Sequence, residues 1–195
     1  MGLNICIING HPDTSEGRFV TALADAYAEG AFDGEHQVSR IDVAHLDFGY
    51  LDSADAFATA PDDILCAARE KIAAADHVVL LYPLWLGSLP AKLKGFLEQV
   101  GRGGFFLDTA GDSSKWPAQK MKGKSARLIV TMGMPGFAYK LIFGAHSLKA
   151  IEQGIFRMSG FRPVRHTILG AVEAAGEKGR LAMLERVRTL GQKGI

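Results

Sequence analysis

The feature that most constrains the fold of this chain is a continuous apolar run, Val78–Tyr82, and the way in which it ends. A run of this kind is typical of a β-strand that is buried on both faces of a sheet. Pro83 breaks the run into a short loop, and Pro90 begins a helix in a position that tolerates a missing N–H. Strand, short loop and helix in this order are the repeating unit of parallel α/β folds.

The same order of strand and helix recurs along the chain. Strands are predicted over five segments: Leu3–Asn9, Val38–Val43, His77–Tyr82, Ser125–Met132 and Arg162–Leu169. Helices are predicted from Gly17 to Tyr27 or Ala28, from Asp62 or Asp63 to about Ala75, from Pro90 to about Val100, from near His146 to Ser159, and over Glu177–Leu190. No linker, repeat or shift in composition divides residues 1–195. We therefore expect one α/β domain, built as a doubly wound five-stranded parallel sheet.

The expected strand order is one of the two that are common in such sheets. We expect the flavodoxin-like order 2-1-3-4-5, which binds a nucleotide at the carboxyl ends of the first and third strands. Two details of packing follow from the sequence pattern. Gly30 and Gly34 are expected to end the first helix. The second helix is expected to pack on the sheet through Ile64, Leu65, Ala68 and Ile72.

Composition argues against several classes of function. The chain holds 22 Lys and Arg residues against 21 Asp and Glu residues, so its charge offers no case for binding nucleic acid or an anionic membrane. Its apolar runs are too short to span a membrane, and the first lacks a basic leader, so we expect a cytoplasmic protein without membrane insertion. Cys6 and Cys66 form no C-x-x-C pair and are interpreted as small buried hydrophobes. His11 lacks neighbouring ligands, so no metal site is predicted.

Polar groups follow the first strand, in the segment Gly10–Phe19. This segment has neither the glycine pattern of a dinucleotide-binding turn nor that of a P-loop. Free N–H groups at the start of the next helix favour a phosphate there, with a hydroxyl from Ser15 and a positive charge from Arg18. Plain helix capping by Ser15 is an equally open interpretation. His11 is expected either to bond the phosphate or to cap the turn.

A flat aromatic side chain follows the third strand, at Trp85, and Gly87-Ser88 come directly after it. Ligands of open α/β sheets bind at the carboxyl ends of the strands. Trp85 and the free amides of this loop are therefore expected where a planar cofactor such as a flavin would bind. The alternative is that Trp85 is a core aromatic and Gly87-Ser88 an ordinary turn.

Glycine residues also follow the fourth strand, in the segment Thr131–Tyr139. Backbone amides there would stabilise the negative charge that develops at the pyrimidine edge of a flavin. Tyr139 is expected to reach the same edge. An ordinary Pro-Gly turn is the alternative interpretation.

The segment Gly101–Lys124 shows neither the helical nor the strand period. A loop of this length is unusual in a compact domain, so we expect it to serve as a lid or as a contact for a partner. The basic run Lys120–Lys124 at its end is expected to be solvated.

Three motifs of the chain together resemble one family. They are Gly10-His11-Pro12 with Ser15, the block from Tyr82-Pro83-Leu84-Trp85 through Pro90-Ala91 to Lys94-Gly95-Phe96, and Thr131-Met132-Gly133. This combination resembles the flavodoxin-like NAD(P)H:quinone oxidoreductase family, which includes the mammalian quinone reductases and the regulatory oxidoreductase subunits of bacterial potassium-efflux systems. The middle block is the specific one. Ser159-Gly160-Phe161 also resembles the segment before the last strand of the family, so the similarity extends over most of the chain.

The resemblance implies a flavin cofactor (FAD or FMN), NAD(P)H as co-substrate, and a homodimer with each active site at the interface. It implies that the flavin phosphate is surrounded by His11, Ser15, Gly17, Arg18 and Phe19. The isoalloxazine ring would be lined by Pro83, Leu84, Trp85, Leu86 and Gly87. Its polar edge would be contacted by Thr131, Met132, Gly133 and Tyr139.

The chain departs from the family pattern near the candidate catalytic residues. Eukaryotic members carry two glycines where this chain has Gly133-Met134. Their active-site histidine lies six residues beyond the matching tyrosine, where this chain has Ala145, and His146 is one position further on. Tyr139 and His146 are the candidate catalytic residues. The chain also lacks the long C-terminal extension of those members, which leaves the choice between FMN and FAD open.

These expectations combine into a flavin-dependent NAD(P)H oxidoreductase. Hydride would pass from the nicotinamide to the flavin, and the donor would leave. A small-molecule acceptor such as a quinone would then take two electrons at the same face, in a ping-pong sequence. Two alternatives stay open: a regulatory redox-sensing flavoprotein subunit for a membrane partner, and a flavodoxin-type electron carrier.

Overall fold

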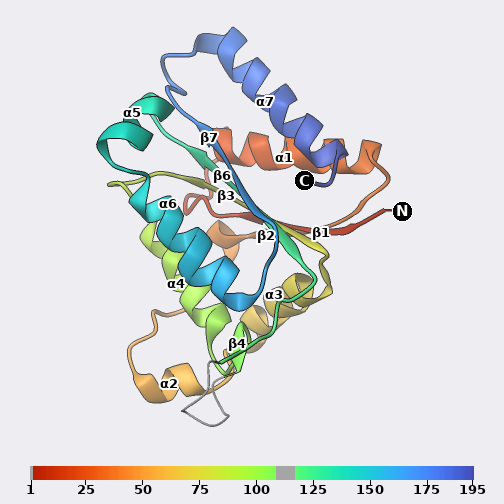
Figure 1. Cartoon of the computed structure of the whole chain (residues 1–195), viewed down its shortest axis with the longest axis vertical. Helices are drawn as coiled ribbons and strands as arrows, with labels where there is room; N and C mark the ends of the chain where they lie inside the picture. The colour runs from red at the N-terminus through yellow and green to blue at the C-terminus, as the bar shows by residue number, and fades with distance from the viewer. Residues whose placement is uncertain (1, 109–116) are drawn as a thin grey trace.

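The computed structural model describes residues 2–108 and 117–195, and its centre is a five-stranded parallel sheet (Figure 1). The strands are β1 (Asn4–Asn9), β2 (Gln37–Asp42), β3 (His77–Pro83), β6 (Ser125–Thr131) and β7 (Val164–Leu169). Their order across the sheet is β2-β1-β3-β6-β7, and each neighbouring pair is parallel. The predicted flavodoxin-like order 2-1-3-4-5 is therefore confirmed.

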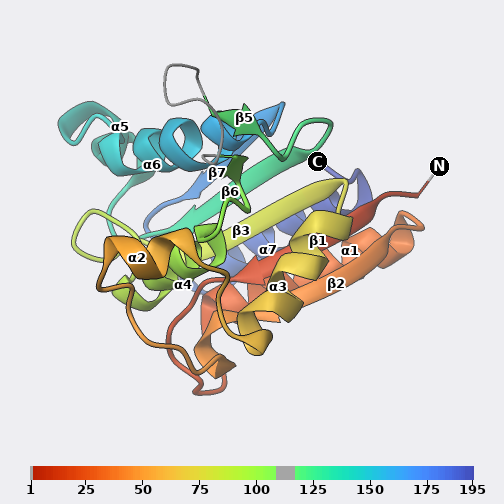
Figure 2. The same cartoon turned by 90° about the horizontal axis from the view of Figure 1, so that it is seen from below.

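Helices cover both faces of the sheet (Figure 2). On one face lie α1 (Phe19–Asp33) and α7 (Gly176–Gln192), and on the other lie α3 (Asp63–Ala74), α4 (Ala91–Gly101) and α6 (His146–Ile151). This is the doubly wound arrangement that the alternating pattern predicts. None of the helices in the described part of the chain has the length and apolarity needed to cross a membrane.

The central strand β3 contributes to two apolar clusters, one on each face of the sheet. Val79 and Leu81 belong to the cluster beneath α1 and α7. Val78, Leu80 and Tyr82 belong to the cluster beneath α3, α4 and α6. Successive side chains of a strand point to opposite faces. Burial on both sides therefore explains why the apolar run in the sequence is continuous.

The first helix, α1, differs from its predicted bounds at both ends. It begins at Phe19, because Gly17 adopts a φ of +79° in the preceding turn. It runs to Asp33 and not to Tyr27 or Ala28, because it passes through Gly30 without a break; Gly34 is its C-cap residue, as expected. A Cβ at Gly30 would lie 1.9 Å from the carbonyl oxygen of Arg188 on α7. Gly30 therefore permits the close approach of two helices and does not end one.

The second predicted helix, α3, confirms most of its expected core face. Leu65, Ala68 and Ile72 are buried, but Ile64 is 43% exposed because it lies on the flank of their stripe. Cys66 on the same helix is only half-buried, which corrects its interpretation as a core residue. Cys6 is fully buried, and burial raises the pKa of its thiol to about 11.

Some short helical segments escape prediction. They are the 3-10 helix η1 (Val43–His45), α2 (Ala54–Ala58) and α5 (Gly136–Ile142). Such segments are too short to show the apolar period of a helix. The predicted helix from His146 to Ser159 is helical throughout, but α6 passes into a π-helical segment, η2 (Glu152–Arg157), before its end.

The segment Gly101–Lys124 contains short strands where we expected a loop. β4 (Leu107–Asp108) pairs antiparallel with β5 (Ala118–Gln119). The N–H of Met121 donates to the carbonyl oxygen of Ser159 at 2.9 Å, which ties the segment to the end of the π-helical region. Residues 109–116, which fall within this prediction, lie outside the described residues.

Candidate functional site

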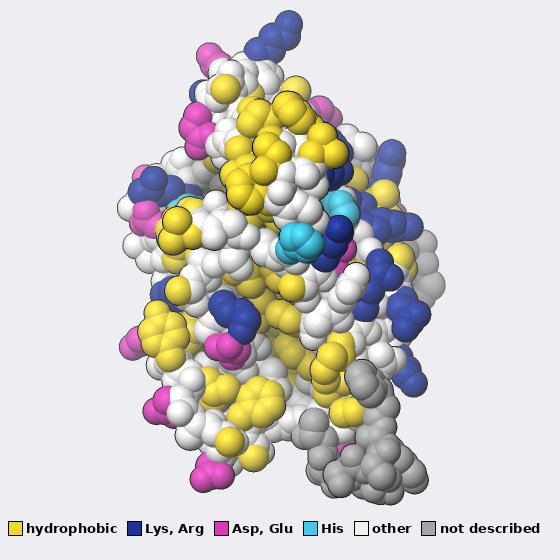
Figure 3. All heavy atoms as spheres, turned by 60° about the vertical axis from the view of Figure 1, so that its left-hand side comes forward, with side chains coloured by type: hydrophobic (Ala, Val, Ile, Leu, Met, Phe, Trp, Pro, Cys, Tyr) yellow, Lys and Arg dark blue, Asp and Glu magenta, His cyan; other side chains and the backbone are white. Residues whose placement is uncertain are grey.

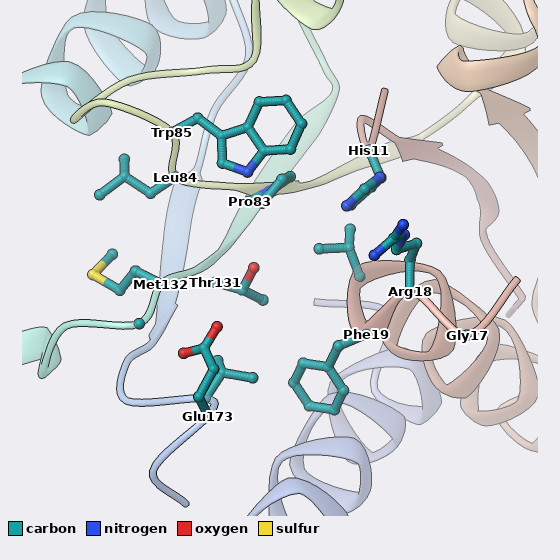
Figure 4. Close-up of a pocket in the computed structure, with 13 residues that line it drawn as sticks. His11, Gly17, Arg18, Phe19, Pro83, Leu84, Trp85, Thr131, Met132 and Glu173 are labelled. Atoms are coloured by element: carbon teal, nitrogen blue, oxygen red, sulfur yellow. The ribbon is translucent and has the colours of Figure 1, made fainter. Parts of the chain in front are cut away.

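The three loops singled out in the sequence meet at the carboxyl edge of the sheet. They follow β1, β3 and β6, and the adjacency of these strands places them around one cavity of about 320 Å³ (Figure 4). Ten predicted site residues line this cavity: His11, Gly17, Arg18, Phe19, Pro83, Leu84, Trp85, Thr131, Met132 and Gly133. Val20, Val172 and Glu173 line it as well.

The loop after β1 is shaped by hydrogen bonds between its own residues. The N–H of His11 donates to Asn9 Oδ1 at 3.3 Å, and the N–H of Asp13 donates to His11 Nδ1 at 3.1 Å. The N–H of Ser15 donates in turn to Asp13 Oδ1 at 2.8 Å. Short polar side chains thus replace backbone pairing, so the loop keeps a defined shape outside helix and strand.

His11 connects the loop after β1 to the loop after β3. Its side chain is buried, and its ring packs edge-on against Trp85 with the ring centroids 5.9 Å apart. Because Nδ1 accepts a bond from the N–H of Asp13, the neutral ring carries its proton on Nε2. Burial, followed by the charge of Arg18, lowers the pKa of His11 below its usual value. His11 is therefore a neutral hydrogen-bond donor at physiological pH.

The start of α1 presents backbone N–H groups to the cavity. Within the described residues no side chain caps this helix, whose N-cap residue is Arg18. The alternative of plain capping by Ser15 is therefore wrong, because Ser15 lies beyond the Gly17 turn. An uncapped helix N-terminus favours a bound anion. Arg18 adds a positive charge there, although its guanidinium also pairs with the carboxylate of Asp13.

The loop after β3 is a tight two-residue turn. The N–H of Trp85 donates to the carbonyl oxygen of Ser88 at 3.0 Å, and the N–H of Ser88 donates back at 2.9 Å. The two central residues, Leu86 (φ +47°) and Gly87 (φ +78°), both adopt left-handed conformations. The turn directs Trp85 and Leu86 outward, so Trp85 is 48% exposed and Leu86 is fully exposed.

The loop after β6 is joined to its neighbours on both sides. The N–H of Leu84 donates to the carbonyl oxygen of Thr131 at 2.8 Å, which ties the loop after β6 to the loop after β3. The N–H of Met132 donates to the carbonyl oxygen of Leu169, the last residue of β7, at 3.0 Å. At the tip, a Cβ on Gly133 would lie 2.9 Å from Glu173 Oε2. Gly133 thus lines the cavity on a firmly held loop, at a place where a side chain would crowd Glu173.

Glu173 is a candidate site residue that the sequence analysis missed. Its carboxylate points into the cavity, on the opposite side from Trp85 (Figure 4). The three motifs follow β1, β3 and β6, although the carboxyl ends of all five parallel strands lie at the same edge. Applying that rule to β7 identifies Glu173 as the first charged residue after the strand.

Some predicted site residues do not line the cavity: Ser15, Leu86, Gly87, Tyr139 and His146. Tyr139 is 1% exposed, and its hydroxyl lies 2.8 Å from Ser147 Oγ, so its side chain is part of the core. The reason is α5, which was not predicted and which turns Tyr139 toward the sheet. His146 is exposed at the first position of α6.

The residues that line the cavity fit a flavin nucleotide. Figure 4 shows His11 and Arg18 on one side, with Leu84 and Met132 on the other and Trp85 between them. The first side offers hydrogen-bond donors and a positive charge for a phosphate. The other offers apolar and aromatic surfaces for a flat ring system. A ligand with an anionic tail and a planar apolar head matches this division.

The sheet is doubly wound and has the strand order β2-β1-β3-β6-β7. At its carboxyl edge, a loop suited to bind an anion lies beside Trp85. These features define a flavodoxin-like α/β protein. The chain belongs to the flavodoxin-like fold family, whose pattern matches residues 3–190. It is 28% identical to an uncharacterized NAD(P)H oxidoreductase of Haemophilus influenzae, over 94% of this chain and 91% of that protein. It is 27% identical to FMN-dependent NADH:quinone oxidoreductase 3 of Bacillus cereus, over 75% of this chain and 79% of that protein.

Solved structures show the same fold. The NAD(P)H:quinone oxidoreductase from Methanothermobacter marburgensis superposes with a TM-score of 0.82, covering 98% of each chain at 20% identity. The relatives and this structure confirm the resemblance to flavodoxin-like NAD(P)H:quinone oxidoreductases that the three motifs predict.

Proposed function

We propose that this protein is a flavin-dependent NAD(P)H oxidoreductase that delivers two electrons to a quinone or a similar small molecule. The observation that carries the proposal is the single cavity where ten predicted site residues, from three distant loops, come together. The names of its relatives, an NAD(P)H oxidoreductase and an FMN-dependent NADH:quinone oxidoreductase, support it. The cofactor is FMN or FAD. We place the activity in the cytoplasm, because Cys6 and Cys66 are free thiols, as in a reducing compartment.

The two sides of the cavity would hold different parts of the flavin. The uncapped N–H groups of α1, together with Arg18, would bind the phosphate. The Nε2–H of His11 would donate to the same group. Leu84, Met132 and Trp85 would pack against the isoalloxazine ring and exclude water from it.

The chemistry of hydride acceptance and electron delivery belongs to the bound flavin. The chain orients the substrates and stabilises charge. The backbone of Gly133, which lines the cavity at the tip of its loop, offers an N–H where negative charge develops on the ring. Tyr139 would act as a positioning residue that holds α6 in place, because its hydroxyl bonds Ser147 on that helix. His146, on the exposed start of α6, stays a candidate catalytic residue.

Donor and acceptor would use the cavity in turn. Trp85 is half-exposed at its rim, so one side is open to molecules from outside. Two planar substrates that occupy the same open side exclude each other. Double-reciprocal plots at several acceptor concentrations should therefore give parallel lines, as ping-pong kinetics require.

We further propose that the protein acts as a homodimer. Hydrophobic side chains gather over α5, where Figure 3 shows a contiguous patch. Its members, between 52% and 81% exposed, are Phe137, Leu141, Ile142 and Phe143. An apolar hollow of about 690 Å³ also runs from Trp85 and Leu86 along α4 and α6. Exposed apolar surface of this kind marks interaction sites. A second copy would bury it and close the open side of the cavity.

The dimer is tested by charging the patch. Leu141→Asp, which places a carboxylate in the proposed interface, should shift the protein from dimer to monomer in light scattering after gel filtration. Leu181→Asp is the matched control, since Leu181 is 58% exposed on α7 and is not a member of the patch. A monomeric parent protein, or equal behaviour of the two variants, would contradict the proposal.

The activity is tested with the purified protein alone. We expect a yellow protein that releases FMN or FAD on denaturation and oxidises NADH or NADPH steadily when a quinone is added. A colourless protein that takes up neither flavin would overturn the proposal. Full flavin occupancy without NAD(P)H oxidation would favour an electron carrier or a regulatory subunit instead.

Gly133→Val tests the place of the loop after β6. A branched side chain there would crowd Glu173 and enter the cavity, so we expect flavin binding to be lost. Gly49→Val is the control, because a Cβ at Gly49 meets nothing within 4 Å. The measurement is the flavin content of each variant after saturation and dialysis. Unchanged content in Gly133→Val would show that this loop does not face the flavin.

A further inference from the structure

The first loop holds a carboxylate among the groups that would bind an anion. Asp13 Oδ1 accepts a hydrogen bond from the N–H of Ser15 at 2.8 Å, and the same carboxylate pairs with the guanidinium of Arg18. Ser15 and Arg18 lie directly before α1, whose uncapped N-terminus would bind the phosphate. Asp13 therefore holds two of the donors that such a phosphate needs.

The charge on Asp13 is permanent at neutral pH. Hydrogen bonds from Ser15, followed by the charge of Arg18, hold the pKa of Asp13 below its usual value. Arg18 is the positive partner, while the nearby ring of His11 is neutral. The net charge that the pair presents to an incoming phosphate is thus close to zero.

We propose that Asp13 is a specificity-determining residue: it competes with the flavin phosphate for Arg18 and disfavours the phosphate monoester of FMN relative to the diphosphate of FAD. A monoester carries nearly two negative charges on one phosphate at neutral pH. Each phosphate of the diphosphate in FAD carries one. Repulsion by a fixed carboxylate grows with the charge placed beside it. This inference rests on the proposed flavin function and adds a rule for which flavin the loop prefers.

Asp13→Asn isolates the charge from the shape of the loop. An asparagine side-chain oxygen can still accept the bond from the N–H of Ser15, so the turn is kept. Arg18 then loses its anionic partner and becomes free for phosphate. Glu16→Gln is the matched control. Glu16 is exposed three residues along the same loop, and its substitution removes the same charge.

The experiment is a titration of flavin-free protein with FMN, FAD and riboflavin at low ionic strength, where exposed charges are least screened. For Asp13→Asn we expect affinity to rise about fivefold for FMN and about twofold for FAD, as charge pairs near a protein surface allow. Riboflavin, which has no phosphate, should bind unchanged. Glu16→Gln, which removes the same charge without freeing Arg18, should change the affinities for FMN and FAD less than Asp13→Asn does.

Two results would overturn the inference. Weaker binding of FMN by Asp13→Asn would mean that Asp13 positions Arg18 for the phosphate. Equal changes for all three flavins would mean that the substitution alters the shape of the loop. Failure of the proposed function looks different, because neither the parent protein nor any variant would then bind any of the flavins.

Discussion

At the scale of the residue, Leu86 occupies a backbone conformation that disfavours its side chain. It has a φ of +47° at the first central position of the turn Trp85–Ser88, where Asn and Gly are preferred. A left-handed conformation costs an ordinary residue about 1–2 kcal/mol. The side chain is fully exposed, so packing within the chain does not offset this strain. Strain of this kind is typical of functional positions. It was not predictable, because φ here follows from the pairing of Trp85 with Ser88.

Leu86→Asn should relieve this strain. It creates the Asn-Gly pair that two-residue turns favour, so we expect the free energy of unfolding to rise by about 1 kcal/mol. Leu86→Ala removes the same exposed side chain but keeps a residue that disfavours the conformation. Urea denaturation of the flavin-free protein compares the two variants. Equal free energies of unfolding for the two variants would show that any gain in stability does not come from relief of strain at Leu86.

At the scale of the element, the contact of α1 with α7 depends on glycines. A Cβ at Gly30 would lie 1.9 Å from a carbonyl oxygen of α7, and a Cβ at Gly191 would lie 2.1 Å from a carbonyl oxygen of α1. Both clashes are with backbone, which cannot rotate away. The sequence pattern predicted both helices but not their contact. It placed a helix end at Gly30 because the packing partner, α7, lies more than a hundred residues further along the chain.

Gly30→Ala should force these two helices apart. We expect a loss of about 2–3 kcal/mol in the free energy of unfolding, in the range seen for overpacked interiors. Gly154→Ala provides the control, since a Cβ there meets nothing within 4 Å and a helical alanine is at least as stable as glycine. Thermal melting followed by circular dichroism measures both. Equal melting temperatures would show that the helices adjust at no cost.

At the scale of the whole molecule, a buried histidine links stability to pH. His77, at the start of β3, is 2% exposed, and its Nδ1 lies 2.7 Å from Ser125 Oγ. Burial, followed by the positive charges of Arg127 and Arg165, lowers the pKa of His77 to about 4. The unfolded chain therefore binds a proton between about pH 6.5 and 4 that the folded protein does not. Stability is lost as the pH falls through this window.

The loss attributable to His77 amounts to about 3 kcal/mol. His77→Gln should remove it, so the free energy of unfolding of this variant should depend less steeply on pH between about 6.5 and 4. The exposed His45 supplies the control variant, His45→Gln, which should follow the parent protein. Denaturant titrations at several pH values give the slopes. Parallel slopes for parent and His77→Gln would contradict the role assigned to this buried side chain.

The sequence by itself determined the succession of strands and helices along the chain and the three loops that carry the motifs. These depend on local properties: the apolar period of each segment and the places where Pro and Gly interrupt it. The tertiary structure decided which side chains of those loops reach the cavity. It placed Glu173 inside and Tyr139 in the core, because both positions depend on segments that are distant in the chain. The ion pair of Asp13 with Arg18 likewise depends on how the first loop folds back before α1. No period in the sequence records contacts of this kind.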